Sequence, residues 1–245
     1  MVDEKSRDLK VALLKAEQSN ALKSSFLNNL SHEIRTPMNA VMGILNVINA
    51  EKNGEMEDEL KIVNSSFNQL LYLIEEILLL SKLHTEQVDI KYREVSLKLL
   101  FQDIVFELKN KISESNKKID IEFEFNGDII VKQDPYLILK MLQHITDNAV
   151  KYTDSGKISL GYGIENSNCY GYVKDTGIGI DEIKMDTIFQ EFKKAEVEDR
   201  FYQGVGIGLA IVKKISDLVE APVTLESEKN KGTIFRVEFK QYNVS

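Results

Sequence analysis

The stretch DPYLILKMLQHITDNAVKYT, residues 134–153, predicts a helix whose first residues are marked. Asp134 suits the N-cap position, because its carboxylate can accept hydrogen bonds from backbone N–H groups that the first turn leaves unpaired. Pro135 suits the first helical position, where its missing N–H costs nothing. We therefore expect a helix from Pro135 to about Tyr152.

Segments with strand character lie on both sides of this helix. Alternating apolar residues predict strands over 87–96, 118–125, 128–133, 156–164, 169–175, 222–228 and 232–240. Apolar residues spaced by three and four predict two further helices, over 97–112 and 206–219. Because strands and helices are interleaved without a strict βαβ rhythm, we expect an α/β sandwich with a mixed sheet covered by helices on one face.

The N-terminal part of the chain has a helical pattern only. Residues 3–50 favour one long amphipathic helix that Pro37 alone interrupts, and the Asn53-Gly54 turn signal separates it from a second apolar periodicity that begins at Val63. The two helices are expected to form a hairpin, and their wide apolar faces cannot be buried entirely against each other. A second hairpin from another chain would complete a four-helix bundle, so we expect a homodimer.

Length, charge and cysteine content limit the classes of function. The 245 residues accommodate three expected parts: the end of a coiled-coil helix (1–24), the hairpin (25–86) and the α/β domain (88–245). A net charge of -8 argues against a nucleic-acid partner. Cys169 is the only cysteine, which fits a reducing cytosol. No stretch has the apolar length of a signal peptide or a membrane span, so we expect a cytoplasmic chain.

A titratable pair lies in the stretch LSHEIRTP, residues 30–37. On a helical wheel, His32 falls opposite the apolar stripe, Thr36 follows it by one turn and Glu33 flanks it. Neutral imidazole is a nucleophile near pH 7, and an adjacent carboxylate can hold one ring N–H and direct the other nitrogen outward. His32 could thus accept a phosphoryl group with Glu33 as orienting base, but an exposed His beside a Glu is also ordinary helix surface.

The longer run FLNNLSHEIRTPMNAVMG, residues 26–43, resembles the phosphoacceptor box of sensor histidine kinases. The resemblance implies that His32 is the phosphorylated histidine, Glu33 its acidic neighbour and Pro37 the proline of the box. It also implies that the rest of the chain holds ATP and Mg²⁺. Thr36 is then expected to position water for the reverse, phosphatase reaction.

Three stretches of the expected α/β domain carry residue types suited to a nucleotide. In the first, Asn148 suits Mg²⁺, Lys151 suits phosphate and Tyr152 offers a face to a base. In the second, Asp175 can accept a hydrogen bond from an exocyclic amine and is followed by a glycine turn. The third is a glycine run before a helix, whose free N–H groups favour phosphate, although its spacing fits neither a dinucleotide motif nor a P-loop. Each pattern by itself is also common capping or loop chemistry.

In this order the three stretches resemble the N, G1 and G2 boxes of the histidine kinase ATP-binding domain, a fold shared with gyrase, mismatch-repair and chaperone ATPases. IFQEF, with Phe189 and Phe192, resembles the F box. The resemblance implies a magnesium ligand, a phosphate contact, an adenine-packing ring and an acceptor for the adenine amine, which are Asn148, Lys151, Tyr152 and Asp175.

The same resemblance assigns roles to the glycines and to one arginine. It implies a turn under the nucleotide at Gly177 and Gly179. It implies a mobile lid over the phosphates that includes Gly204, Gly206, Gly208 and Leu209, with Arg200 reaching the γ-phosphate. The chain departs from the family at His144, where asparagine is frequent, and this histidine either packs or makes a water-bridged contact.

The expected function is therefore that of an ATP-dependent protein histidine kinase of a two-component system. The resemblance implies a homodimer that passes its phosphoryl group from His32 to an aspartate of a response-regulator receiver domain. It also implies a sensor domain upstream of this chain and a full-length protein that can be anchored in the inner membrane. Two alternatives stay open, a nucleotide-binding pseudokinase or scaffold and an ATPase or serine kinase of the same fold.

Overall fold

The computed structural model describes residues 34–39, 41–43, 56–85, 87–115, 117–125, 127–166, 168–185, 187–191, 205–240 and 242–244. The turn expected at Asn53-Gly54 and most of the first expected helix lie outside these residues. The chain forms two compact units, one of residues 1–78 and 203–206, the other of residues 79–202 and 207–245.

In the first unit, every described residue before residue 79 is helical. Residues 34–39 and 41–43 are helical, and α2 spans Met56–His84, its last turns belonging to the second unit. One face of α2 is buried and contains Ser66, Leu73, Glu76, Leu80 and Leu83. The opposite face is exposed although it is apolar, and it contains Phe67, Leu71, Ile74 and Leu78. The spacing of four, three and four residues within this exposed set makes a continuous stripe.

The second unit is built on a five-stranded mixed sheet with the order β2-β4-β5-β7-β6. The strands are β2 (Lys118–Phe125), β4 (Ser155–Glu165), β5 (Asn168–Asp175), β6 (Val223–Glu228) and β7 (Gly232–Phe239). β2 and β4 are parallel, and the other neighbouring strands are antiparallel. The predicted mixed sheet is therefore confirmed.

Three further strands form a separate small sheet with the order β1-β3-β8. They are β1 (Arg93–Ser96), β3 (Ile129–Gln133) and β8 (Tyr242–Val244). The strand predicted over 87–96 was wrong for its first six residues, because β1 pairs with β3 over only four residues. The strand β8, which is three residues long and pairs with β3, was not predicted from the sequence.

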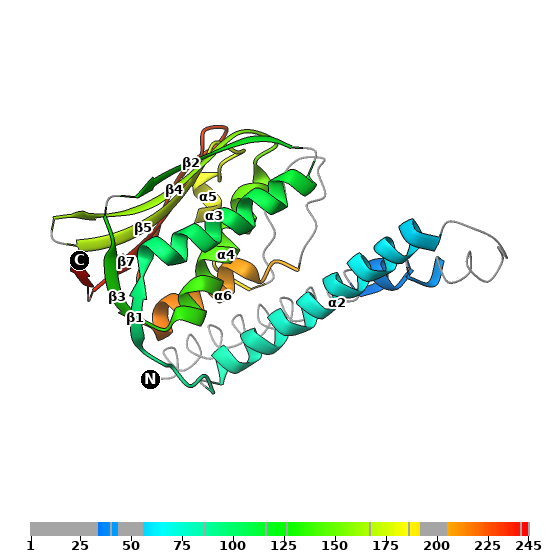
Figure 1. The fold of residues 1–245 in the computed structure, drawn as a ribbon, viewed down its shortest axis with the longest axis horizontal. Coiled ribbons are helices and arrows are strands. Elements are labelled where there is room, and N and C mark those ends of the chain that lie inside the picture. The colour runs from blue at the N-terminus through cyan, green and yellow to red at the C-terminus, as the bar shows by residue number, and fades with distance from the viewer. Residues whose placement is uncertain are drawn as a thin grey trace, which may run out of the picture. The chain divides into compact units, whose positions relative to one another are not determined.

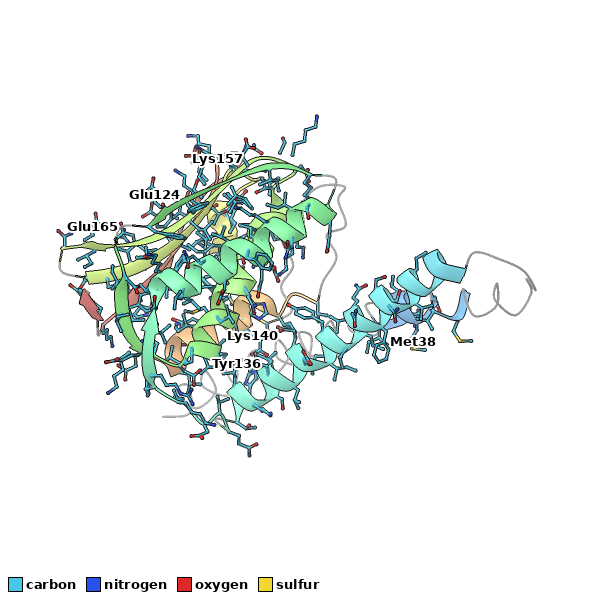
Figure 2. All side chains as sticks on the ribbon, viewed as in Figure 1. Met38, Glu124, Tyr136, Lys140, Lys157 and Glu165 are labelled. Carbon is cyan, nitrogen blue, oxygen red and sulfur yellow. The ribbon has the colours of Figure 1, made fainter. Side chains whose placement is uncertain are left out.

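Three helices cover one face of the five-stranded sheet (Figure 1). They are α3 (Leu97–Glu114), α4 (Pro135–Tyr152) and α6 (Gly208–Leu218), and α5 (Glu182–Met185) is a single turn. β5 alternates along its length, with Cys169, Gly171, Val173 and Asp175 buried. The opposite face of the sheet carries charged side chains, and Figure 2 shows Glu124, Lys157 and Glu165 there, away from the helices.

No helix within the described residues is both long enough and apolar enough to cross a membrane.

Candidate functional site

Helix α4 supplies the residues predicted for the N box, and its start is fixed as the sequence predicts. The Asp134 Oδ1 atom accepts hydrogen bonds from the amides of Tyr136 at 3.0 Å and Leu137 at 3.1 Å. Its Oδ2 atom accepts from the amide of Lys91 at 2.7 Å. α4 thus begins at Pro135 and ends at Tyr152.

The last two turns of α4 present the candidate nucleotide contacts. Asn148, Lys151 and Tyr152 are all half-buried. The Lys151 ammonium lies 5.1 Å from the centroid of the Tyr152 ring, within the range of a cation–π interaction. A positive charge and an aromatic face therefore adjoin each other at the carboxyl end of the helix.

Asp175 is the last residue of β5 and is buried beside the glycine turn that follows this strand. It is 7% exposed, and burial raises the pKa of its carboxyl group to about 6, although hydrogen bonds from the amides of Gly177 and Thr233 act in the opposite direction. The Gly177 amide donates to Asp175 Oδ1 at 2.8 Å. A buried carboxylate with few compensating donors is suited to accept a hydrogen bond from a ligand amine.

The turn after β5 requires glycine at two of its positions. A Cβ on Gly177 would lie 2.4 Å from the carbonyl oxygen of Tyr152. Gly179 has φ +64°, and a Cβ there would lie 2.0 Å from the carbonyl oxygen of Glu228. The turn is therefore in close backbone contact with the end of α4 on one side and the β6–β7 hairpin on the other.

Hydroxyl groups that the sequence reasoning missed surround this turn. The Ser227 Oγ atom accepts from the amide of Ile180 at 2.8 Å and lies 2.9 Å from the Thr233 Oγ1 atom. Thr153 is fully buried, and its Oγ1 atom has no hydrogen-bond partner among the residues the structure describes. Thr153 directly follows the predicted N-box residues, and Thr233 follows a glycine, but neither pattern shows that the residue adjoins Asp175.

The start of α6 is the candidate phosphate-binding element. Ile207 is its N-cap and offers no side-chain hydrogen bond to the first turn, so the amides there are available to a ligand anion. Gly208 opens the helix, and a Cβ on it would lie 3.2 Å from the Nδ1 atom of His144. His144 is buried and therefore packs against the backbone at this helix start. Leu209 is half-buried.

Several predicted residues cannot be placed with the others. His32, Glu33, Phe192, Arg200 and Gly204 lie outside the described residues. In the first unit, Thr36 is exposed on its helix and Gly206 has φ +79°. In the second unit, Phe189 is half-buried in a turn after α5. The G1 glycine turn thus contacts the end of α4, which carries the predicted N-box residues, and Gly208 of the G2 box contacts His144 of the same helix.

Two family models match the chain in the order that this architecture requires. The family described as "His Kinase A (phospho-acceptor) domain" matches residues 22–86. The family described as "Histidine kinase-, DNA gyrase B-, and HSP90-like ATPase" matches residues 133–243. The chain is homologous to the sensor histidine kinases.

Relatives of known identity agree with this assignment to the histidine kinases. The autoinducer 2 sensor kinase/phosphatase LuxQ of Vibrio vulnificus is 32% identical over 237 residues, which are 92% of this chain and 27% of LuxQ. The chain thus spans between about a quarter and about a third of the length of the curated relatives it matches.

Solved structures of histidine kinases share the fold. The Acinetobacter baumannii histidine kinase AdeS has a TM-score of 0.67 at 22% identity, covering 86% of this chain and 98% of AdeS. The histidine kinase ThkA in complex with the response regulator protein TrrA has a TM-score of 0.62 at 21% identity, covering 91% of this chain and 63% of that one. At these identities the structures support the fold alone.

Proposed function

We propose that this chain is an ATP-dependent protein histidine kinase that autophosphorylates His32 and passes the phosphoryl group to an aspartate of a response-regulator receiver domain. The observation that carries the proposal is the position of Asp175, a buried carboxylate beside a glycine turn that contacts the end of α4, within the match to the histidine kinase ATPase family. A plain ATPase or a scaffold is not favoured, because a phosphoacceptor domain precedes the ATPase domain in the same chain.

In this proposal the α/β domain binds the adenine of ATP at one set of residues and its phosphates at another. The Asp175 carboxylate accepts a hydrogen bond from the adenine amine, and the glycine turn lets the backbone approach the base. Tyr152 packs on the adenine, while Lys151 beside it contacts phosphate. The α6 amides bind phosphate at the helix start, where Gly208 and Leu209 lie, and the lid residues Gly204, Gly206 and Arg200 close on it.

The chain also offers a fitting ligand for magnesium. Asn148 is half-buried one turn before Lys151, and an amide oxygen is the hard donor that Mg²⁺ accepts. Mg²⁺ is usually held by one or two protein oxygens together with substrate phosphates, so a single amide on α4 is consistent with a shared site. When bound, the ion would neutralise charge that develops on the transferring phosphoryl group.

His32 is the proposed nucleophile for the transfer. Its free ring nitrogen forms the new N–P bond to the γ-phosphorus while the bond between that phosphorus and the bridging oxygen breaks, and ADP leaves. Glu33 holds the other ring N–H and thereby directs the reacting nitrogen outward. Lys151 and Arg200 oppose the negative charge of the transition state. Thr36 positions water for the reverse phosphatase reaction, and the name of LuxQ records both activities for that relative.

The helical part of the chain is proposed to dimerise and to receive the partner protein. We place the end of a signalling coiled coil at 1–24, the dimerisation and phosphotransfer hairpin at 25–86 and the ATP-binding domain at 88–245. The exposed apolar stripe of α2 supports a homodimer, because a second hairpin would cover it. The solved complex of ThkA with TrrA supports a receiver domain as the partner. The substrate ATP places the reaction in the cytoplasm, and an upstream sensor with a membrane anchor is proposed for the longer protein.

The reaction class is tested by incubating the chain with Mg²⁺ and ATP labelled either in the α- or in the γ-phosphate. Transfer to histidine predicts a γ-derived label that remains on the denatured protein, resists alkali and is lost in acid, with no label from the α position. An acid-stable label would indicate a hydroxyl acceptor, and no label on a chain that binds ATP would indicate binding without transfer. Either result would contradict the proposal.

A further inference from the structure

A lysine that no predicted motif contains holds the carboxyl end of α4. Lys117 lies just before β2, and its Nζ atom donates to the carbonyl oxygens of Val150 at 2.6 Å, Lys151 at 2.9 Å and Thr153 at 2.9 Å. An ammonium group has three N–H donors, so these three bonds use all of them. The side chain is 26% exposed, which makes the cluster partly shielded from water.

These bonds complete the hydrogen bonding of the last turn of α4. The last four carbonyl groups of a helix have no partner within the helix beyond a capping contact. Here the Ala149 carbonyl accepts from the Thr153 amide at 3.1 Å, and the Tyr152 carbonyl accepts from the Ile178 amide at 3.2 Å. The carbonyls of Val150 and Lys151 accept from the Lys117 ammonium. A cation at a helix carboxyl terminus is also favoured by the helix dipole.

The same turn carries two of the candidate nucleotide contacts. Lys151 and Tyr152 project from it, and the Tyr152 carbonyl joins it to the turn that contains Gly177. If the turn frayed, the phosphate contact, the aromatic ring and the glycine turn would be displaced together. Lys117 reaches this turn from the position just before β2, and β2 is paired with β4, so Lys117 links the turn to the five-stranded sheet.

We propose that Lys117 is a positioning residue of the nucleotide site. It acts through the backbone of α4, holding the last turn so that Lys151, Tyr152 and the glycine turn meet ATP in one arrangement. This inference rests on the proposed function, because it concerns the affinity of the same site for ATP.

The test compares Lys117→Met, which keeps the aliphatic stem and removes the donors, with the wild-type chain. The Kd for Mg²⁺-ATP by calorimetry and the KM for ATP in autophosphorylation are both expected to rise about tenfold, because the contacts are no longer held in place before binding. The rate at saturating ATP is expected to change by less than about threefold, since bound ATP itself orders the turn. Lys117→Arg, which retains donors, should recover most of the affinity.

The matched control is Lys240→Met, which removes an exposed lysine paired with Glu220 at 2.9 Å and should leave the Kd unchanged. A Lys117→Met protein with a lower Tm but a wild-type Kd would overturn the inference, because the lysine would then be structural only. If Lys117→Met does not fold, Lys117→Gln, which keeps two donors, is judged by the same Kd. A wild-type chain that binds no ATP would overturn the proposed function first, and this inference with it.

Discussion

The carbonyl oxygen of Tyr152 accepts a hydrogen bond from the amide of Ile178 across 3.2 Å. This bond joins the last residue of α4 to the middle of the glycine turn that follows β5. Two stretches that are separated by more than twenty positions in the sequence are thus in direct backbone contact. A change on either side is therefore expected to affect both.

Gly177→Ala tests this contact between the end of α4 and the glycine turn directly. The added Cβ would lie 2.4 Å from the Tyr152 carbonyl oxygen, and the nearby atoms are backbone or buried side chains that cannot move easily. We expect a loss of about 1–3 kcal/mol in the free energy of unfolding. ATP affinity is expected to fall at least about tenfold because the turn must shift. Thermal unfolding and calorimetry measure the two effects.

The control for this substitution is Gly43→Ala. Gly43 is helical, and no atom from the described part of the chain lies within 4 Å of the position where its Cβ would stand. Alanine there should leave ATP affinity unchanged and raise helix stability slightly. An unchanged ATP affinity in Gly177→Ala would contradict the close contact between the turn and α4.

Asp175→Asn should make the protein more stable at neutral pH while it abolishes ATP binding. Burial raises the carboxyl pKa from 3.8 to about 6, so the stability that Asp175 contributes is fully present below about pH 4 and is lost as the pH rises through about 6. The difference of about 2 pH units corresponds to about 3 kcal/mol. Asparagine does not ionise, so the variant should gain stability relative to the wild type between about pH 4 and about pH 8.

Urea unfolding at the two pH values measures this difference, and calorimetry should show that Asp175→Asn no longer binds ATP. The matched control is Asp217→Asn, which changes an exposed carboxylate paired with Lys213 and should show neither effect. A stability difference between wild type and Asp175→Asn that does not change with pH would contradict the raised pKa.

The exposed stripe of α2 should be the dimer contact. Replacing Leu71 and Ile74 with lysine places two charges in the centre of this stripe, and the resulting chain should sediment as a monomer. Glu75→Lys is the control, because Glu75 is exposed between the two faces and is charged already. A double variant that remains dimeric would place the dimer contact elsewhere.

His144 and Gly208 should be coupled energetically. A Cβ on Gly208 would lie 3.2 Å from the His144 Nδ1 atom, so Gly208→Ala requires the imidazole to shift and should weaken ATP binding. His144→Ala makes room, and the double variant should be less impaired than the sum of the single changes, with a coupling of about 0.5–3 kcal/mol. Additive effects would show that His144 does not pack on the start of α6 in the nucleotide-bound protein.

Helix α4 and most of the strands could be predicted because the residues that determine them lie within the element or directly beside it in the sequence. Asp134 and Pro135 fixed the start of α4, and apolar alternation located most of the strands. The pairing of β8 with β3 could not be predicted, because a three-residue strand at the end of the chain depends on a partner more than a hundred residues away.

The sequence indicates which residues could bind the nucleotide, but it does not indicate which residues hold them in position. Asp175 and the glycines carry recognisable chemistry in their own sequence. Lys117, Ser227 and Thr233 are ordinary polar residues whose contacts with α4 and the glycine turn arise from the sheet register and the chain's return path. Such contacts join distant segments, and no spacing in the sequence records them.

The central claim is that His32 accepts the γ-phosphoryl group of ATP. The most direct measurement is the acid-labile γ-label on the wild-type chain, on His32→Gln and on His84→Gln, which removes another of the three histidines. We predict label on the wild type and on His84→Gln, and none on His32→Gln although it still binds ATP. Label that persists on His32→Gln at the wild-type level would contradict the account.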